Sequence, residues 1–272
     1  PINGEFAGHL IPMKDYGGAL GWTYLALRRM AYERYTLDVR ALIERAGNTW
    51  KKRILNRLFS SAAETLGSSG KSVPFADGGT ADPGYVPPSN DGRSFLYTHN
   101  HFGRAADDAA GRLAAVKAMV AHLQEHGHQA PFDLVVPEVD AADWVGVTGF
   151  KYPERAYLNT AGVETRALVP DDQFLGIIDV ERGWARVVLE PRLPTNYAGM
   201  FKPMGYGSPS NPLAVRYEEG FPLGLTMVAT PNQFPLQDAI AYFTFGVGVA
   251  NRTAGTAYYF AASGDYTDPT IS

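Results

Sequence analysis

The fold is decided by one stretch, AADDAAGRLAAVKAMVAHLQEH, at residues 105–126. Asp107 and Asp108 stand near its beginning, where the helix dipole favours negative charge, and Gly127 supplies a stop. Apolar side chains recur at helical spacing along one face, namely Leu113, Val116, Val120 and Leu123. The stretch therefore predicts a long continuous helix on which strands can pack.

Downstream of this helix the pattern becomes that of short strands. Apolar segments occur at 134–136, 174–179, 184–189, 196–204, 213–217, 223–229 and 241–249. The second and third are expected to form a hairpin, and the fourth and fifth a second hairpin with a longer tip. Helices followed by strands, without an internal repeat, predict an α+β fold rather than alternating βαβ units.

Upstream of the long helix the chain divides into an arm and a helical segment. Residues 1–18 contain several glycines and prolines with little periodicity, so we expect an extended arm. The apolar spacing then predicts three short helices, at about 20–31, 39–46 and 50–59, with Gly47 ending the second.

Residues 67–93 are rich in glycine, proline and small polar residues. Unstructured loops longer than about 12–15 residues are uncommon in compact domains unless they have a function. Phe75, Tyr85 and Val86 argue against a disordered linker, because disordered tracts are poor in aromatic and β-branched residues. We expect an extended loop that becomes ordered by lying on a neighbouring molecule.

The composition limits the partners. Charged residues make up 19%, against about 25% in typical soluble domains, which suggests a partly covered exterior. The net charge of −4 argues against tight nucleic-acid binding by the whole chain. Residues 1–60, with ten Lys/Arg and five Asp/Glu, are compatible with DNA or with a solvated helix face. The lack of cysteine excludes disulfides, and no apolar stretch approaches the ~20 residues of a membrane span.

Two histidine motifs resemble metal sites without completing one. HLQEH at 122–126 matches the spacing of inverted zinc peptidases, which would make His122 and His126 ligands. Its second histidine lies at the helix end and no later helix offers a third ligand, so solvated histidines are favoured by about ten to one. HNH at 99–101 has no partner at a meaningful spacing.

Other candidate motifs are also incomplete. GSSGKS at 67–72 ends like a phosphate-binding loop, but Thr65 stands where the first glycine is needed. The adjacent carboxylate pairs at 107–108, 171–172 and 218–219 would diverge on a helix or strand. Gly246-Val247-Gly248 lacks the third glycine of a dinucleotide site. We therefore expect no catalytic residue, no cofactor-binding residue and no metal ligand, and a protein that is not an enzyme.

Several stretches resemble the major capsid proteins of tailed bacteriophages, the Hong Kong 97-like capsid family. They are GW (183–184), RLPTNY (192–197), NPLAVRY (211–217), FPLQDA (234–239) and FGVGVANR (245–252), with THNHF (98–102) before the long helix. The resemblance covers about 95–260. It implies a fold with an N-terminal arm, an extended loop, a long spine helix in a peripheral domain and a mixed β-sheet axial domain.

The resemblance also implies the division of the chain and its role. It assigns 1–63 to the arm and helical segment, 64–104 to the extended loop, 105–137 to the spine helix and start of the peripheral domain, 138–250 mainly to the axial domain, and 251–272 to a C-terminal segment. The expected function is a structural subunit that self-assembles through hexamers and pentamers into an icosahedral shell around double-stranded DNA. A start at Pro1 would fit the family's removal of an N-terminal scaffold segment.

The same resemblance implies the partners and the location. The first partner is the chain itself, and non-specific contact with packaged DNA is expected, with scaffold, maturation protease, portal and decoration proteins as further candidates and no membrane. The protein would be assembled in the bacterial cytoplasm and reside in the virion. Two alternatives remain open: an encapsulin-type bacterial compartment shell, and a zinc-dependent hydrolase using His122 and His126.

Overall fold

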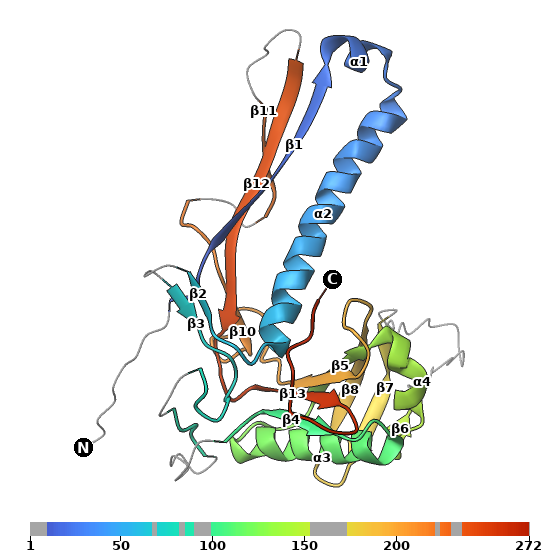
Figure 1. Cartoon of the computed structure of the whole chain (residues 1–272), viewed down its shortest axis with the longest axis vertical. Coiled ribbons are helices and arrows are strands. Elements are labelled where there is room, and N and C mark those ends of the chain that lie inside the picture. The colour runs from blue at the N-terminus through green and yellow to red at the C-terminus, as the bar shows by residue number, and fades with distance from the viewer. Residues whose placement is uncertain are drawn as a thin grey trace, which may run out of the picture. The chain divides into compact units, whose positions relative to one another are not determined.

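The computed structural model describes residues 10–66, 70–81, 85–89, 99–152, 173–220, 224–229 and 236–271. They form two compact units (Figure 1). Unit 1 takes its described residues from Pro1–Arg57, Glu64–Ser72 and Ala214–Gly248, and unit 2 from Leu58–Ala63, Val73–Leu213 and Val249–Ser272. Each unit is therefore assembled from distant parts of the sequence.

Unit 2 is built on a mixed seven-stranded sheet. Its strand order is β4 (Phe102–Ala105), β13 (Gly255–Phe260), β9 (Tyr197–Phe201), β5 (Phe132–Pro137), β8 (Gly183–Glu190), β7 (Phe174–Val180) and β6 (Phe150–Lys151). The β4–β13 and β5–β8 pairs are parallel and the others are antiparallel. Central strands carry alternating or continuous buried residues, as expected for a sheet covered by helices.

Helix α3 (Ala109–Glu125) packs on this sheet and fills its core. The predicted apolar stripe is confirmed: Val116, Val120 and Leu123 are buried and Leu113 is partly buried against the same cluster. The Asp108 carboxylate caps the first turn by accepting from the backbone N–H of Gly111 at 2.6 Å. The helix begins four residues later than predicted because β4 extends to Ala105.

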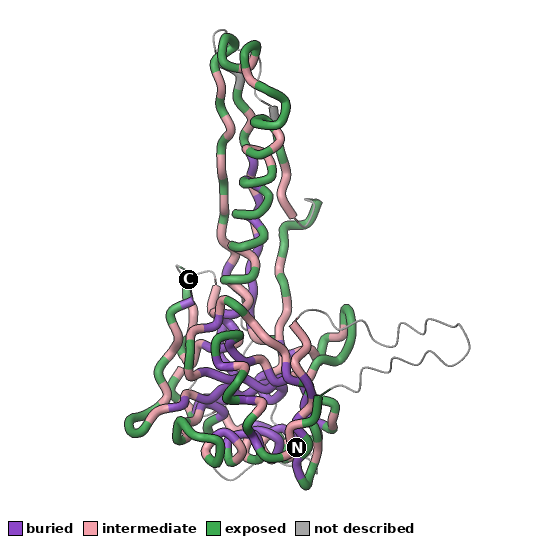
Figure 2. Tube along the Cα trace, turned by 90° about the vertical axis from the view of Figure 1, so that its right-hand side faces the viewer, coloured by how far each residue is buried: buried purple, intermediate pink, exposed green. Residues whose placement is uncertain are grey.

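Two short helical turns follow β5. The 3₁₀ turn η1 (Glu138–Asp140) leads into α4 (Ala141–Val145), which carries the fully buried Trp144. The tube in Figure 2 shows most of the buried residues gathered in unit 2. This unit therefore has a hydrophobic core of its own.

Unit 1 consists of one long helix beside a narrow antiparallel sheet. The helix is α2 (Tyr32–Phe59), preceded by α1 (Tyr24–Arg29). In the sheet, β12 (Leu236–Val249) pairs on one side with β1 (Lys14–Thr23) and on the other with β10 (Leu213–Arg216) and β11 (Thr226–Ala229). A small hairpin of β2 (Glu64–Leu66) and β3 (Gly70–Ser72) completes the unit.

Helix α2 lies against one face of this sheet. The Trp50 ring stacks on Phe245 of β12 at 3.7 Å between centroids, and Trp22 of β1 lies 5.4 Å from Tyr35. Gly18 permits the close approach, because a Cβ there would stand 2.8 Å from the Leu42 side chain. No helix in the described part of the chain is long and apolar enough to cross a membrane.

The N-terminal predictions need correction. Residues 14–18 are not a free arm, since they belong to β1, and the helix expected from residue 20 begins only at Tyr24. The helices predicted at 39–46 and 50–59 are one continuous helix through Gly47. A Cβ at Gly47 would meet nothing within 4 Å, so the position costs only its propensity, about 1 kcal/mol. Packing of the neighbouring turns outweighs that cost.

The predicted loop and second hairpin also differ from the structure. Residues 70–72 form β3, and Val73 and Phe75 are buried in unit 2, so this part of the 67–93 segment is no extended arm. The stretches 67–69, 82–84 and 90–98 lie outside the described residues. The hairpin predicted between 174–179 and 184–189 is confirmed. The one between 196–204 and 213–217 is wrong, because β9 and β10 enter different sheets.

Candidate functional site: a polar pocket and a histidine cluster

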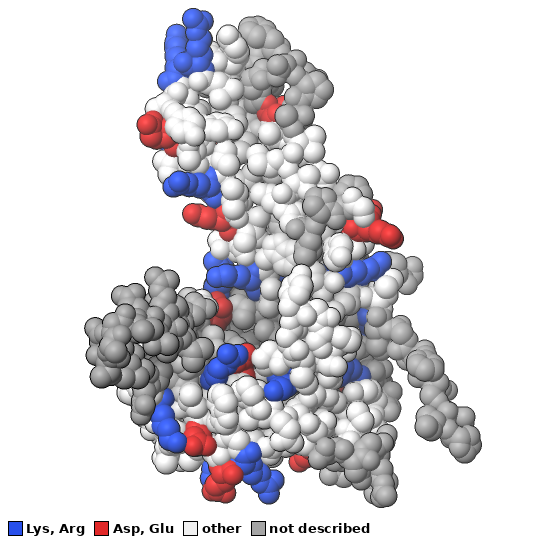
Figure 3. Space-filling model, turned by 180° about the vertical axis from the view of Figure 1, so that it is seen from behind, with Lys and Arg blue, Asp and Glu red and all other residues white. Residues whose placement is uncertain are grey.

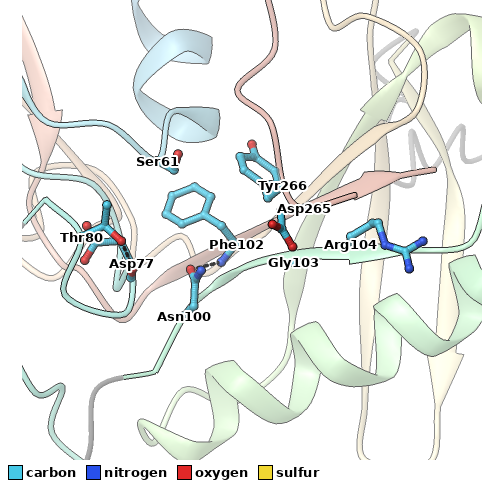
Figure 4. Close-up of a pocket in the computed structure, with 9 residues that line it drawn as sticks. All are labelled: Ser61, Asp77, Thr80, Asn100, Phe102, Gly103, Arg104, Asp265 and Tyr266. Carbon is cyan, nitrogen blue, oxygen red and sulfur yellow. Dashed lines mark hydrogen bonds between the residues drawn. The ribbon is translucent and has the colours of Figure 1, made fainter. Parts of the chain in front are cut away.

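Unit 2 contains a polar pocket of about 300 Å³ (Figure 4). Its lining residues come from the ends of α2 and β4, from the segment before β4 and from the C-terminal segment: Ser61, Asp77, Thr80, Asn100, Phe102, Gly103, Arg104, Asp265 and Tyr266. Two aromatic rings from separate segments, Phe102 and Tyr266, meet at 5.1 Å between centroids.

The polar groups of this pocket are engaged in internal hydrogen bonds. The buried Asp77 carboxylate accepts from the backbone N–H of Gly79 at 3.2 Å and pairs with the Arg252 guanidinium at 3.3 Å. The Ser61 hydroxyl donates to Asp268 at 2.7 Å. Among the described lining residues there is no histidine or lysine to activate a hydroxyl. The arrangement favours a structural role for the pocket over catalysis.

The raised pKa of one lining residue, Tyr266, leads us to expect that the protein loses stability at alkaline pH. Burial, followed by the nearby Asp268 and Tyr197, raises the pKa of Tyr266 well above 10.0, and its hydroxyl donates to the Phe59 carbonyl. As the pH rises, the tyrosine of the unfolded chain ionises before Tyr266 of the folded chain. The contribution of Tyr266 to the unfolding free energy is therefore complete below pH 10 and is lost as the pH rises further. We expect the unfolding free energy to fall less steeply above pH 10 in Tyr266→Phe, by up to about 1.4 kcal/mol per pH unit. Urea unfolding between pH 8 and 11 measures this, and equal slopes would contradict it.

A second candidate site in unit 2 is a cluster of three imidazoles, called here the histidine cluster: His99, His101 and His126. Their Nε2 atoms lie 3.1 Å (99 to 101), 3.0 Å (99 to 126) and 3.0 Å (101 to 126) apart. Among the described residues this is a group of histidine and acidic side chains whose ligand atoms converge closely enough to hold one metal ion. His101 is fully buried and the other two are half-buried.

Backbone carbonyls hold two of these rings in place. The His101 Nδ1 lies 2.8 Å from the Gly255 oxygen of β13, and the His126 Nδ1 lies 2.6 Å from the Pro88 oxygen. A carbonyl oxygen only accepts, so each Nδ1 carries the hydrogen and donates. A fourth imidazole, His122, stacks on His101 with 5.4 Å between centroids and 6° between planes.

The imidazoles of this region are neutral near neutral pH. Burial, followed by His126 and His122, lowers the pKa of His99 to about 4. Burial also lowers the pKa of His101 well below 6.5, and that of His122 and His126 in the same direction. Neutral imidazole is the form that ligates metal ions, so the basic nitrogens are available without loss of a proton.

Two segments bring the cluster together. His99 and His101 flank Asn100, which forms a β-bridge with Asp77, in the short segment that leads into β4. His126 is the C-cap of α3, one turn after His122. The parallel pairing of β4 with β13 and the packing of α3 across both strands then set these two segments side by side.

The sequence-based reading of these histidines needs correction. Of the two ligands suggested by HLQEH, His126 joins the cluster, whereas His122 lies outside the three converging residues. Neither is a solvated surface histidine, since the His122 Nδ1 is buried without a hydrogen-bond partner in the described structure. HNH at 99–101 has no partner nearby in the sequence, because its partner His126 stands at the far end of α3. The one indication in the sequence that these histidines meet was that one histidine motif precedes the predicted helix and the other ends it.

The described residues of the remaining motifs belong to secondary structure, caps or exposed loops. The last three residues of the GSSGKS motif, 70–72, form β3, and no helix begins in the described residues 73–81 that follow. Asp108 is the cap of α3 and Asp107 pairs with Arg112 at 2.7 Å. Glu218 and Glu219 are exposed, and residues 171–172 lie outside the described residues. Gly246 and Gly248 are buried within β12.

Comparison with solved structures reveals the fold family. A structure from Mycobacterium phage Patience matches with a TM-score of 0.68 at 20% identity, over 95% of this chain and 73% of that chain. The bacteriophage PhiM1 mature capsid matches with a TM-score of 0.55 at 10% identity, over 92% of this chain and 72% of that chain. The SrpI encapsulin complex of Synechococcus elongatus PCC 7942 matches with a TM-score of 0.53 at 7% identity, over 94% of this chain and 76% of that chain.

Sequence comparison adds nothing to this: neither a protein-family model nor a curated protein matches. The likeness therefore lies in the arrangement of helices and strands, over nearly the whole chain. The α+β class predicted from the sequence is confirmed. The chain has the Hong Kong 97-like fold of tailed-phage capsid proteins.

Proposed function

We propose that the chain is a shell-forming major capsid protein, whose copies assemble through hexamers and pentamers into an icosahedral shell around phage double-stranded DNA. The fold supports this, and the observation that carries it is the exposed apolar surface of unit 1. Most of the large hydrophobic side chains that remain exposed in the described chain belong to this unit. They include Leu37 and Ile43 of α2 and Met227, Val228 and Ile240 of the sheet.

The outer face of the unit 1 sheet has a small-residue and apolar part around Ala19, Ile240 and Val228, beside the exposed Asp15 and Asp238. Along β1 the exposed positions between Asp15 and Thr23 are Gly17, Ala19 and Gly21. Across β12 and β11, Ile240 stands directly opposite Val228, with 46% and 47% of their surfaces exposed. A solvated antiparallel sheet normally alternates apolar and polar residues. This face fits contact with another copy of the chain.

Charged side chains are also sparse over the chain as a whole, at 19% of its residues. In the view of Figure 3, lysine, arginine and acidic side chains are scattered between wide uncharged areas. Intersubunit contacts would cover such a surface and contribute much of the stability of unit 1. Many modest contacts repeated around a closed shell combine into strong overall association.

We further propose that α2 is the spine helix and unit 1 the peripheral domain. Helix α2 has 28 residues and α3 has 17, and α2 lies along a narrow sheet as a spine would. Helix α3 shares its core with the seven-stranded sheet of unit 2, which fits an axial domain. This assignment replaces the spine expected at 105–137 and moves 214–248 out of the axial domain.

The same proposal includes the partners and location expected from the sequence. The partners are packaged DNA, with scaffold, maturation protease, portal and decoration proteins as further candidates, and the location is the virion after assembly in the bacterial cytoplasm. The role is structural rather than enzymatic. In support, the polar pocket has no paired nucleophile and base among its lining residues. An encapsulin-type shell is the second candidate, because that fold also matches.

Negative-stain electron microscopy with light scattering tests self-assembly. Closed shells or capsomer rings from purified full chain are expected, and co-purifying nucleic acid would favour the phage role. Shells holding a cargo protein without nucleic acid would favour the encapsulin. A homogeneous monomer of 29.5 kDa at every concentration and ionic strength would contradict self-assembly.

A further inference from the structure

The hydrogen bonds of His101 and His126 bring their two Nε2 atoms into a contact that two neutral imidazoles do not make. Both rings donate from Nδ1 to carbonyl oxygens, so in neutral imidazole each Nε2 carries only a lone pair. Yet these two Nε2 atoms lie 3.0 Å apart. Two lone pairs at this separation repel each other in a buried site unless a cation lies between them.

The third nitrogen completes a geometry suited to a metal ion rather than to a shared proton. The His99 Nε2 lies 3.1 and 3.0 Å from the other two, so the three atoms form a nearly equilateral triangle. One hydrogen on His99 would satisfy a single side of this triangle. Metal–nitrogen bonds of about 2.0–2.1 Å place neighbouring ligands about 2.9 Å apart in octahedral and about 3.3 Å apart in tetrahedral coordination. The observed triangle lies between these values.

We propose that His99, His101 and His126 bind one divalent late first-row transition-metal cation, with Zn²⁺ the representative. Three imidazole nitrogens suit zinc, copper, nickel or iron, whereas Mg²⁺ and Ca²⁺ require oxygen ligands. Ligating histidines almost always donate their second ring N–H to a carbonyl, carboxylate or water, and the Gly255 and Pro88 oxygens fill this role. This inference departs from the expectation that the chain has no metal ligand.

Such an ion would join two separate segments of unit 2. It would link the segment before β4 to the end of α3, and His126 would carry the constraint on to Pro88. Among the described residues no acidic side chain belongs to the converging group, and the neighbouring Glu125 is exposed. The site therefore acts as a structural link, distinct from a zinc peptidase centre.

Metal titration of the chelator-treated full-length protein tests the site. We expect one Co²⁺ per chain with a visible d–d spectrum of nitrogen coordination, displacement by Zn²⁺, and a higher unfolding temperature with Zn²⁺. His126→Ala and His99→Ala should each weaken binding at least about 100-fold, since losing even an outer-shell partner costs about 10–100-fold. Neither side chain is fully buried, so both variants should fold.

His128→Gln is the matched control, because His128 is a nearby buried histidine whose Nε2 bonds to Thr253 at 3.0 Å. It should bind Co²⁺ like the parent chain. No binding by the folded parent chain, or equal binding by His126→Ala, would overturn the proposal. Loss of binding in His128→Gln together with both cluster variants would also overturn the assignment of ligands. Shell assembly is scored separately, so the two proposals can fail independently.

Discussion

Replacing Ile240 by glutamate is expected to abolish shell assembly while leaving the chain folded. Ile240 is 46% exposed on β12, opposite Val228 of β11, on the same sheet face as the exposed Gly17, Ala19 and Gly21 of β1. Burying an isoleucine stabilises a contact by about 1.5–3 kcal/mol, whereas an unpaired buried carboxylate costs several kcal/mol. The loss recurs at every copy of the contact, so its effect on a shell is large.

Sedimentation velocity and electron microscopy of the Ile240→Glu variant measure this effect. The unassembled variant should keep its far-UV circular dichroism and lose no more than about 0.5 kcal/mol of unfolding free energy, as is usual at exposed positions. Ile240→Leu is the matched control, because it keeps an apolar side chain at the same place and should assemble. Shells of normal yield from the glutamate variant would show that this face is not an intersubunit contact.

Replacing Trp144 by alanine is expected to give the largest loss of stability in unit 2. Its indole is fully buried, meets Phe260 edge to face at 5.6 Å, and has the Arg112 guanidinium 5.9 Å from its ring. Truncating a buried tryptophan to alanine removes apolar contacts and leaves a cavity, at about 3–5 kcal/mol. Total stabilities of domains are about 5–15 kcal/mol, so about a fifth or more of the stability would be lost.

Urea unfolding followed by circular dichroism measures the Trp144→Ala change. Trp144→Phe serves as its control and should lose less, because an aromatic ring still fills most of the site. The Trp144 Nε1 has no hydrogen-bond partner in the described residues, so phenylalanine removes no hydrogen bond among them. An alanine variant within about 1 kcal/mol of the parent would mean that unit 2 does not depend on this core.

Helix α3 shows what local sequence can determine. Its cap, its apolar stripe and its end are encoded within one contiguous stretch, since helix hydrogen bonds and i, i+4 contacts are local. The β7–β8 hairpin was predicted for the same reason, because a short turn determines its own pairing. Helix α2 was predicted as two separate helices, because its continuity through Gly47 depends on contacts with a sheet built from residues far away in sequence.

The histidine cluster illustrates the difference between what the sequence determines by itself and what depends on the tertiary structure. The sequence by itself determined the α+β class, the long α3 helix, most of the strand positions and the presence of two histidine motifs. Only the tertiary structure decided which strands share a sheet and that His99 and His101 meet His126. Periodicity reports which side of an element is apolar, but not which distant element covers that side. The pairing of β4 with β13 and the packing of α3 make that choice.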